Sequence, residues 1–295
     1  MSYEMWIIVI GSLSGITCGI MGCFLILRKL SMLADAISHT VLLGIVAAFL
    51  ISQSMSGMYM FIGAAIAGLL TAFLVQFLHS LGNQEDASIG VVFTFLFAVG
   101  VILISLFADD VHLDVDHALM GEITFVPWDT AEIGFLPQWP KAFYMLGFVL
   151  IANLLFITFF YKELKITSFD EQMAAAIGIP IVLIHYILMG MVSITTVASF
   201  DSVGAILVVA MLIAPGASAY LLTDRFFIML CLSAFFGVLA AVSGYFFASL
   251  IDASISGSMA MMNGVIFFLV LLLSPTKGLI FRKWKLKKLN MEENV

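Results

Sequence analysis

Two side chains that can bind a metal ion lie four residues apart in an apolar stretch near the amino terminus. Asp35 and His39 belong to the segment Leu33-Ala-Asp-Ala-Ile-Ser-His39, and apolar residues continue from there to Ile51. On a helix, positions i and i+4 share one face, so the carboxylate and the imidazole can reach the same ion. Ionisable side chains at membrane depth are costly and generally mark ligand sites or ion pathways. The residues also allow a second interpretation, in which an Asp–His hydrogen bond only joins two helices.

The composition places this pair in a lipid bilayer. Hydrophobic residues make up 63% of the 295 positions and charged residues only 11%, which no soluble domain of this size could accommodate. We expect an all-α polytopic membrane protein with about nine transmembrane helices (eight to ten), because a helix of about 20 apolar residues crosses a bilayer. The apolar segments are residues 5–27, 31–51, 58–78, 89–108, 141–161, 181–200, 203–222, 226–250 and 258–274.

The basic residues predict how these spans are oriented. Of the 12 lysines and arginines, only Lys141 falls on one side of the predicted spans, and the rest fall on the other. Because positively charged loops tend to stay inside, we expect the amino terminus outside and the carboxyl terminus in the cytoplasm. Residues 1–280 would form a single transmembrane domain, followed by a cytoplasmic tail at 281–295.

A loop on the predicted cytoplasmic side carries start and stop signals for a short helix. Ser168 and Glu171 have the spacing of a capping box, and Asp170 adds negative charge to the first turn. Gly178 suits the left-handed position after a helix. We expect a coupling helix at about residues 168–178 that docks on a cytoplasmic partner, with a passive interfacial segment as the alternative. The residues assigned to this role are Ser168, Asp170, Glu171, Ala174 and Gly178.

The predicted outer loop at about residues 109–140 is acidic. Seven carboxylates and two histidines precede the next basic residue, Lys141, and together they attract cations. Histidine beside carboxylates can hold a divalent metal transiently or meet a basic partner surface. A loop that is acidic only because it is solvated is the alternative. The residues assigned to extracellular contact are Asp114, Asp116, His117 and Glu122.

One predicted span contains a possible hinge. Pro215 and Gly216 lie inside the seventh span, and a proline within a helix removes a backbone hydrogen bond and bends the helix. We interpret the pair as a hinge between two orientations of the spans. A fixed kink that serves packing is an equally good interpretation.

Several strings together resemble a known family. The segment Leu27-Arg-Lys-Leu-Ser-Met-Leu-Ala-Asp-Ala-Ile-Ser-His39 is similar to the signature of the membrane permeases of zinc/manganese-type ABC importers, an Asp-Ala-x-Ser-His element followed by Leu-Pro-Gly. Leu212-Ile-Ala-Pro-Gly216 and Ser274-Pro-Thr-Lys-Gly278 resemble the same family. The likeness covers roughly residues 7–280. One departure is Leu43, which stands where the family usually has proline.

The resemblance implies a fold and a set of partners. It implies a homodimeric permease of the bacterial cell membrane with a fold related to that of cobalamin and siderophore importers. Two cytoplasmic ATP-binding subunits would dock on the loop helices, and an extracellular binding protein would deliver the metal. No cofactor would be bound permanently and no nucleic acid would be a partner. If two copies meet around a two-fold axis, Asp35 and His39 of both would form a cage of two carboxylates and two imidazoles.

The ligand types and the resemblance together predict the cargo and the class of function. Carboxylate and imidazole suit manganese, zinc or ferrous iron, and the resemblance favours manganese. A permease for metal chelates would need a wide, neutral or aromatic cavity, and an ion-coupled carrier would use Asp35 to relay protons. The chain carries no Gly-rich phosphate loop and no catalytic motif of an intramembrane enzyme. We therefore expect a transport subunit, with ATP hydrolysis in a separate chain.

Overall fold

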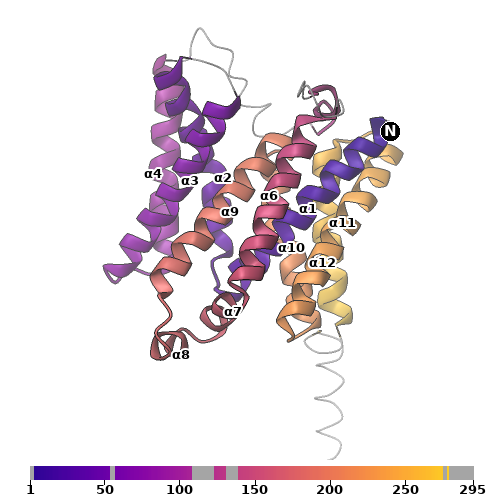
Figure 1. Cartoon of the computed structure of the whole chain (residues 1–295). Helices are drawn as coiled ribbons and strands as arrows, with labels where there is room; N and C mark the ends of the chain where they lie inside the picture. Colours follow the sequence, from indigo (N-terminus) through magenta and orange to yellow (C-terminus); the bar gives the residue numbers. More distant parts are fainter. Residues whose placement is uncertain (1–2, 54–56, 108–122, 131–138, 275–277, 279–295) are drawn as a thin grey trace, which may run out of the picture.

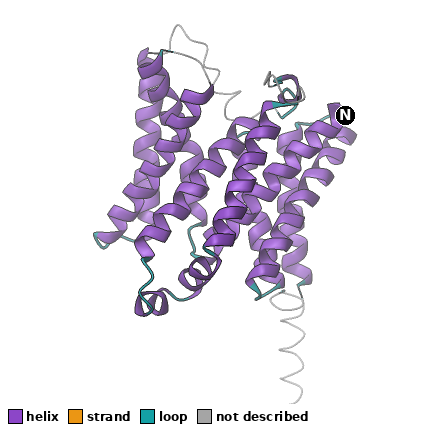
Figure 2. Cartoon of the chain, viewed as in Figure 1, coloured by secondary structure: helices purple, strands orange, loops and turns teal. Residues whose placement is uncertain are grey.

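The structure is a computed structural model, which describes residues 3–53, 57–107, 123–130, 139–274 and 278. The secondary structure of these residues is helical except for turns and an isolated bridge between Thr130 and Pro140 (Figure 2). Nine of the described helices are long and apolar enough to cross a membrane, which confirms the expected number. They are α1 (Tyr3–Leu27), α2 (Ser31–Ser52), α3 (Gly57–Ser80), α4 (Glu85–Phe107), α6 (Lys141–Phe159), α9 (Ile181–Val203), α10 (Ala205–Leu222), α11 (Phe226–Ile251) and α12 (Ile255–Leu273).

Three shorter helices lie outside the spans, η1 (Val126–Trp128), α7 (Tyr161–Phe169) and α8 (Glu171–Ala176). Helices α7 and α8 lie at the end of the bundle opposite to the amino terminus (Figure 1). The predicted cytoplasmic loop and the predicted outer terminus therefore occupy opposite ends. Which end faces the cytoplasm stays a prediction.

Some spans begin earlier than the apolar segments indicate. Helix α4 begins at Glu85, with Asp86 also in its first turn, whereas the apolar segment begins at residue 89. Helix α12 begins at Ile255, where the Ser254 hydroxyl caps the helix by accepting a hydrogen bond from the Gly257 amide. The difference has one cause: polar residues favour the first turn of a helix, and a count of apolar residues leaves them out.

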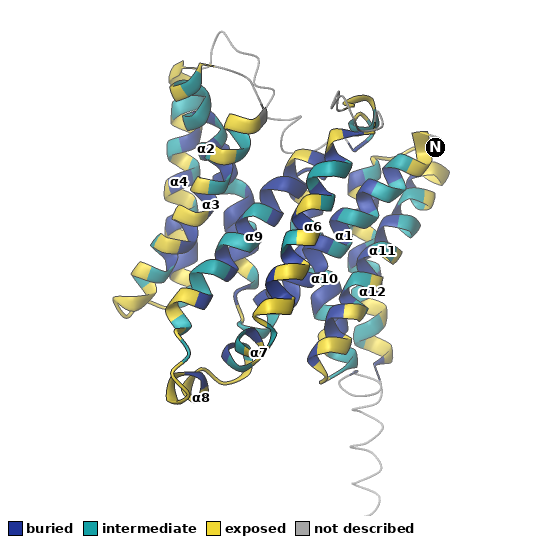
Figure 3. Cartoon of the chain, in the orientation of Figure 1, coloured by how far each residue is buried: buried dark blue, intermediate teal, exposed yellow. Residues whose placement is uncertain are grey.

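The helices form two groups that are joined through the middle of the molecule. Helices α2, α3 and α4 pack together on one side, and α1, α10, α11 and α12 pack on the other, with α9 between them (Figure 1). Helix α1 is the most deeply buried span and α4 the most peripheral. Buried residues line the contacts between helices, and exposed residues cover the outer faces (Figure 3). The chain thus has a central helix, α1, and a peripheral group that contains the Asp35 and His39 helix.

Small residues and hydroxyl groups bring the helices of the larger group close together. An added Cβ at Gly22 of α1 would lie 1.7 Å from the Leu212 carbonyl oxygen of α10. The Ser233 hydroxyl of α11 donates a hydrogen bond to the Gly19 carbonyl of α1 over 2.7 Å. Close approach and hydrogen bonds between helices are what hold membrane bundles together, since lipid is as apolar as the helix surfaces.

Candidate functional site

The Asp35 and His39 side chains lie next to each other on α2, as their spacing predicts. His39 Nε2 and Asp35 Oδ1 are 3.5 Å apart, which is longer than a strong charge-assisted hydrogen bond. By the rise of an α-helix, Asp35 lies about 6 Å and His39 about 12 Å along α2 from Ser31. The two groups therefore point to the same region at membrane depth without being locked to each other.

The surroundings of the pair come from two other helices. The His39 ring extends from α2 towards α4, and its centroid lies 5.3 Å from the ring centroid of Phe93 and 5.8 Å from that of Phe97. On another side, the first turns of α10 help to form a pocket of about 230 Å³. Asp35 is the acidic residue and His39 the basic residue of its lining, which consists of Asp35, His39, Ala205, Ile206 and Val209. A carboxylate and an imidazole thus line the pocket together with three apolar side chains.

Between residues 33 and 44, the face of α2 that carries these groups is the one that the described part of the chain covers least. From residue 33 to residue 44, only Asp35, His39 and Leu43 are not buried. These three residues, spaced at i, i+4 and i+8, form a single stripe along the helix, which we call the uncovered stripe. Side-chain exposure is 42% for Asp35 and 32% for His39. Between residues 33 and 44 the other residues of α2 are buried, so the helix cannot rotate to cover the stripe without exposing some of them.

One copy of the chain contributes too few ligands for a complete site. Among the residues that the structure describes, no group of three or more His, Cys, Asp or Glu side chains is placed to hold a metal ion. Divalent metals in proteins generally have four or more ligands. The Asp35 and His39 pair is therefore half of a four-ligand site at most.

The loop helix differs from the prediction at its beginning. Helix α8 spans only Glu171–Ala176, and its N-cap is Asp170, whose Oδ1 accepts a hydrogen bond from the Met173 amide over 2.9 Å. The predicted capping box of Ser168 and Glu171 was wrong, because α7 continues through Ser168 and ends at Phe169. The Ser168 hydroxyl instead accepts a hydrogen bond from Arg28 Nε over 3.4 Å.

The end of the loop helix agrees with the prediction. Gly178 has φ +85°, and its amide and the Ile179 amide each bond back to carbonyls of α8, at Ala175 and Ala174. This is the left-handed helix ending that favours glycine. The conformation directs the chain away from α8 towards α9.

Two large apolar side chains are exposed at α8, beside the exposed Glu171 and Gln172, and the sequence had not led us to expect them. Met173 and Ile177 are 57% and 61% exposed, whereas Ala174 is fully buried. Ala174 thus holds α8 against the rest of the chain and does not face a partner. An i, i+4 pair of large apolar residues in a loop is the sequence signal that could have found this surface.

The predicted hinge lies at a close helix contact. Pro215 is inside α10, which is helical on both sides of it. An added Cβ at Gly216 would lie 3.2 Å from the Cys23 amide nitrogen of α1. Pro215 and Gly216 therefore take part in the contact between α1 and α10. Their role as a hinge stays a prediction.

The predicted outer contact residues Asp114, Asp116, His117 and Glu122 lie outside the described residues. In the described part of this loop, Lys141 Nζ and Asp129 Oδ1 are 2.6 Å apart, and the Tyr3 hydroxyl donates a hydrogen bond to the Thr124 carbonyl. These contacts attach the segment 123–130 to the beginnings of α6 and α1.

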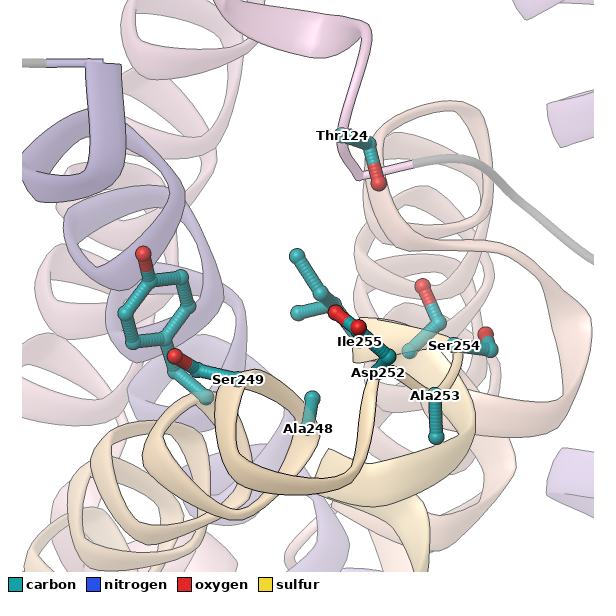
Figure 4. Close-up of a pocket in the computed structure, with 9 residues that line it drawn as sticks. Thr124, Ala248, Ser249, Asp252, Ala253, Ser254 and Ile255 are labelled. Carbon is teal, nitrogen blue, oxygen red and sulfur yellow. The ribbon is translucent and has the colours of Figure 1, made fainter.

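A second pocket lies at the same end of the bundle as the amino terminus. It has a volume of about 450 Å³ and lies between Thr124 and the turn from α11 to α12. Among the described residues, Asp252 is the one acidic residue of its lining, and hydroxyl groups such as those of Ser249 and Ser254 supply further polar atoms (Figure 4). One carboxylate with neutral hydroxyls is a weaker ligand set than the carboxylate and imidazole on α2.

Both the sequence and the fold of this chain are similar to those of known proteins. The sequence model of the ABC 3 transport family matches residues 2–274. The chain is 61% identical to the manganese transport system membrane protein MntD of Bacillus subtilis (strain 168), over 99% of each chain. It is 43% identical to the zinc transport system membrane protein TroD of Treponema pallidum (strain Nichols), over 99% of this chain and 79% of the relative. In fold, it is similar to PsaBC from Streptococcus pneumoniae in complex with Fab, with a TM-score of 0.79, 33% identity and coverage of 97% and 96%.

Proposed function

Because this chain belongs to the ABC 3 transport family, we propose that it is the membrane permease of an ATP-driven importer of a divalent metal ion, with manganese as the cargo. The observation that carries the proposal is the carboxylate and imidazole pair on the uncovered stripe of α2. These ligand types accept manganese, zinc and ferrous iron alike. Relatives named for manganese and for zinc are both similar to this chain, and the higher identity of the manganese relative supports manganese.

We propose that a second copy of the chain covers the uncovered stripe. A charged group that faced lipid at membrane depth would cost roughly 2.5 to 3.5 kcal/mol or more. A two-fold axis near the stripe would replace lipid with the same face of the partner copy and bring two carboxylates and two imidazoles together. A divalent cation would neutralise the two carboxylates, so ion binding offsets the cost of placing these groups in the membrane.

The exposed end of the molecule at α8 supports docking of a separate ATP-binding subunit. Met173 and Ile177 present an apolar surface outside the spans, where contact with another protein would remove it from water. We assign Asp170, Glu171 and Gly178 to the position and shape of this helix. At the other end, an extracellular binding protein would deliver the metal to the outer loop that contains Asp114, Asp116, His117 and Glu122.

The ligand types beside the pocket argue against a metal-chelate cargo. A chelate would need a wide cavity lined by neutral or aromatic groups, whereas Asp35 and His39 contribute a carboxylate and an imidazole to their half of the proposed site.

ATP-dependent Mn²⁺ uptake tests the proposed function directly. The full chain and the ATP-binding subunit that accompanies it would be placed in proteoliposomes and supplied with Mn²⁺ together with the binding protein proposed to deliver the metal. We expect uptake that requires ATP. Uptake by the permease without any ATP-binding subunit would instead support an ion-coupled secondary carrier.

Cysteine cross-linking tests the second copy. Ile206 lines the pocket beside Asp35 and is 61% exposed. In a Cys231→Ala background, Ile206→Cys should form covalent dimers with a thiol-reactive cross-linker in membranes. Phe148→Cys, on the outer face of α6 and 74% exposed, is the matched control and should stay monomeric. Equal cross-linking at both positions would contradict an interface on the Ile206 side.

Gly178→Ala should weaken the attachment of the ATP-binding subunit. Alanine at φ +85° costs about 1 to 2 kcal/mol, so α8 would change its position to relieve that strain. We expect about five- to thirtyfold less ATP-binding subunit to co-purify with this variant. Gly82→Ala is the matched control, because Gly82 has φ +94° and, as at Gly178, an added Cβ would meet nothing within 4 Å. If both variants retain the subunit equally, the docking assignment of α8 is wrong.

A further inference from the structure

Arg28 connects two segments that lie far apart in the sequence. It follows the last residue of α1, and its guanidinium reaches the last turn of α7. Arg28 Nη2 donates a hydrogen bond to Thr167 Oγ1 over 2.8 Å, and Arg28 Nε donates to Ser168 Oγ over 3.4 Å. One side chain thus bonds to two consecutive hydroxyls immediately before α8.

Thr167, which accepts one of these hydrogen bonds, is fixed in position by burial and by a hydrogen bond of its own. Thr167 is buried, with 1% of its surface exposed, and its hydroxyl donates to the Glu163 carbonyl over 2.8 Å. That bond orients the hydroxyl so that its oxygen can accept from Arg28. Burial lowers the pKa of the Arg28 guanidinium, and the negative charge of Glu171 in α8 opposes this effect. The cation is therefore held by hydroxyl groups of α7, and the charge of Glu171 in α8 favours its charged form.

Arg28 lies next to the turn that leads into the metal-site helix. Lys29 has φ +63°, and the Leu30 amide bonds back to the Leu25 carbonyl over 2.8 Å. Leu30 is buried, and α2 begins at the next residue, with Asp35 only seven positions after Arg28. The turn is thus anchored on both sides, and a shift of Arg28 would be transmitted to the first turn of α2.

Helix α2 has few contacts with α1, so the turn that follows Arg28 is a main link between the two helices. Helix α2 packs mainly against α3 and α4 and only slightly against α1. A second connection runs from α8 through α9 to α3, where the Ser193 hydroxyl donates to the Ala65 carbonyl over 3.2 Å. Helix α9 also contacts α2 directly. Arg28 differs from that route because only Lys29 and Leu30 separate it from the first residue of α2.

We propose that Arg28 is a positioning residue that links the α7–α8 junction to the α1–α2 turn, so that displacement of α8 moves the Asp35 and His39 pair. The inference rests on the proposed function, since it assigns the step between ATP-driven movement of α8 and exposure of the metal site. In the absence of this link, α8 would still bind the ATP-binding subunit, and Asp35 and His39 would still bind the ion. The two events would no longer be coordinated.

The test compares two neighbouring charge removals in the complete transporter. Arg28→Gln removes the guanidinium that contacts α7. Lys29→Gln removes the same charge from the next residue, which is exposed and makes none of the side-chain hydrogen bonds found in the described part of the chain. Both variants would be placed in proteoliposomes with the ATP-binding subunit, the metal-delivering binding protein would be added, and Mn²⁺ uptake would be measured per ATP hydrolysed.

We expect about a tenfold loss of Mn²⁺ uptake per ATP in Arg28→Gln, the factor that a hydrogen bond to a charged group commonly contributes. Lys29→Gln should transport like the parent. Mn²⁺ bound by the purified Arg28→Gln protein should equal that of the parent, which a general loss of structure would not allow. Unchanged uptake per ATP in Arg28→Gln would overturn the proposal.

Thr167→Val keeps the proposal testable if Arg28→Gln does not fold. Valine has the shape of threonine and lacks the hydroxyl that accepts from Arg28, so the same loss of uptake per ATP is expected. The double variant, Arg28→Gln with Thr167→Val, should be no worse than Arg28→Gln alone, because Arg28→Gln already removes the hydrogen bond to Thr167. Normal coupling in Thr167→Val would overturn the proposal. If the parent protein takes up no Mn²⁺, the proposed function fails and the role of Arg28 is not the cause.

Discussion

Replacing His39 with alanine should abolish Mn²⁺ uptake while the protein still folds and enters the membrane. In a symmetric pair of chains, the change removes two of four proposed ligands. Loss of a group that merely supports a metal ligand costs about 10- to 100-fold in affinity, so loss of a ligand should cost at least about 100-fold. His39 is only partly buried, so the truncation leaves no large cavity and should affect stability little.

Asp35→Asn tests the charge separately from the shape. The amide has the size of the carboxylate but carries no negative charge, so the proposed cage would lose both of its charges. We expect uptake to fall as it does in His39→Ala. Leu43→Met, which changes the third residue of the uncovered stripe and keeps its volume nearly constant, should leave uptake within about twofold of the parent. Metal content of the purified proteins and uptake in proteoliposomes measure both effects.

Full uptake in either ligand variant would show that the metal site is elsewhere. The Asp35 and His39 pair would then be an ordinary contact on a helix surface. The cross-linking of Ile206→Cys would remain informative in that case, because it reports the interface without reference to metal.

Gly22→Ala should prevent the larger group of helices from assembling correctly. The new Cβ would lie 1.7 Å from the Leu212 carbonyl oxygen and 2.7 Å from its carbon. A backbone carbonyl within a helix cannot rotate away as a side chain can, so α1 and α10 would have to separate. Overpacking commonly costs about 1 to 3 kcal/mol, and we expect the upper end of that range or more here. The expected result is a large drop in the yield and unfolding temperature of the purified protein.

Gly147→Ala is the matched control for this prediction. Gly147 lies within α6, and an added Cβ there would meet nothing within 4 Å. Alanine is favoured over glycine within a helix by about 1 kcal/mol, so this variant should be as stable as the parent or slightly more stable. If Gly22→Ala and Gly147→Ala unfold at the same temperature, α1 and α10 are not packed as closely as the structure describes.

Features that depend on neighbouring residues could be predicted without the structure. Nine spans follow from nine apolar runs, because the length needed to cross a bilayer is a property of each segment alone. The shared face of Asp35 and His39 follows from helical periodicity. The left-handed conformation of Gly178 follows from the permissive backbone of glycine after a helix. The metal-site hypothesis rests on features of this local kind.

Only the tertiary structure determined which surfaces are covered and which distant segments touch. The predicted cap at Ser168 failed because α7 continues past that residue, and its hydroxyl is used by Arg28, 140 positions away. The uncovered stripe of α2 was not predictable either, since α3, α4 and α10 decide which face stays accessible. The physical reason is that burial depends on the summed packing of segments that are remote in sequence, whereas the periodicity and the conformational preferences of a residue belong to the chain itself.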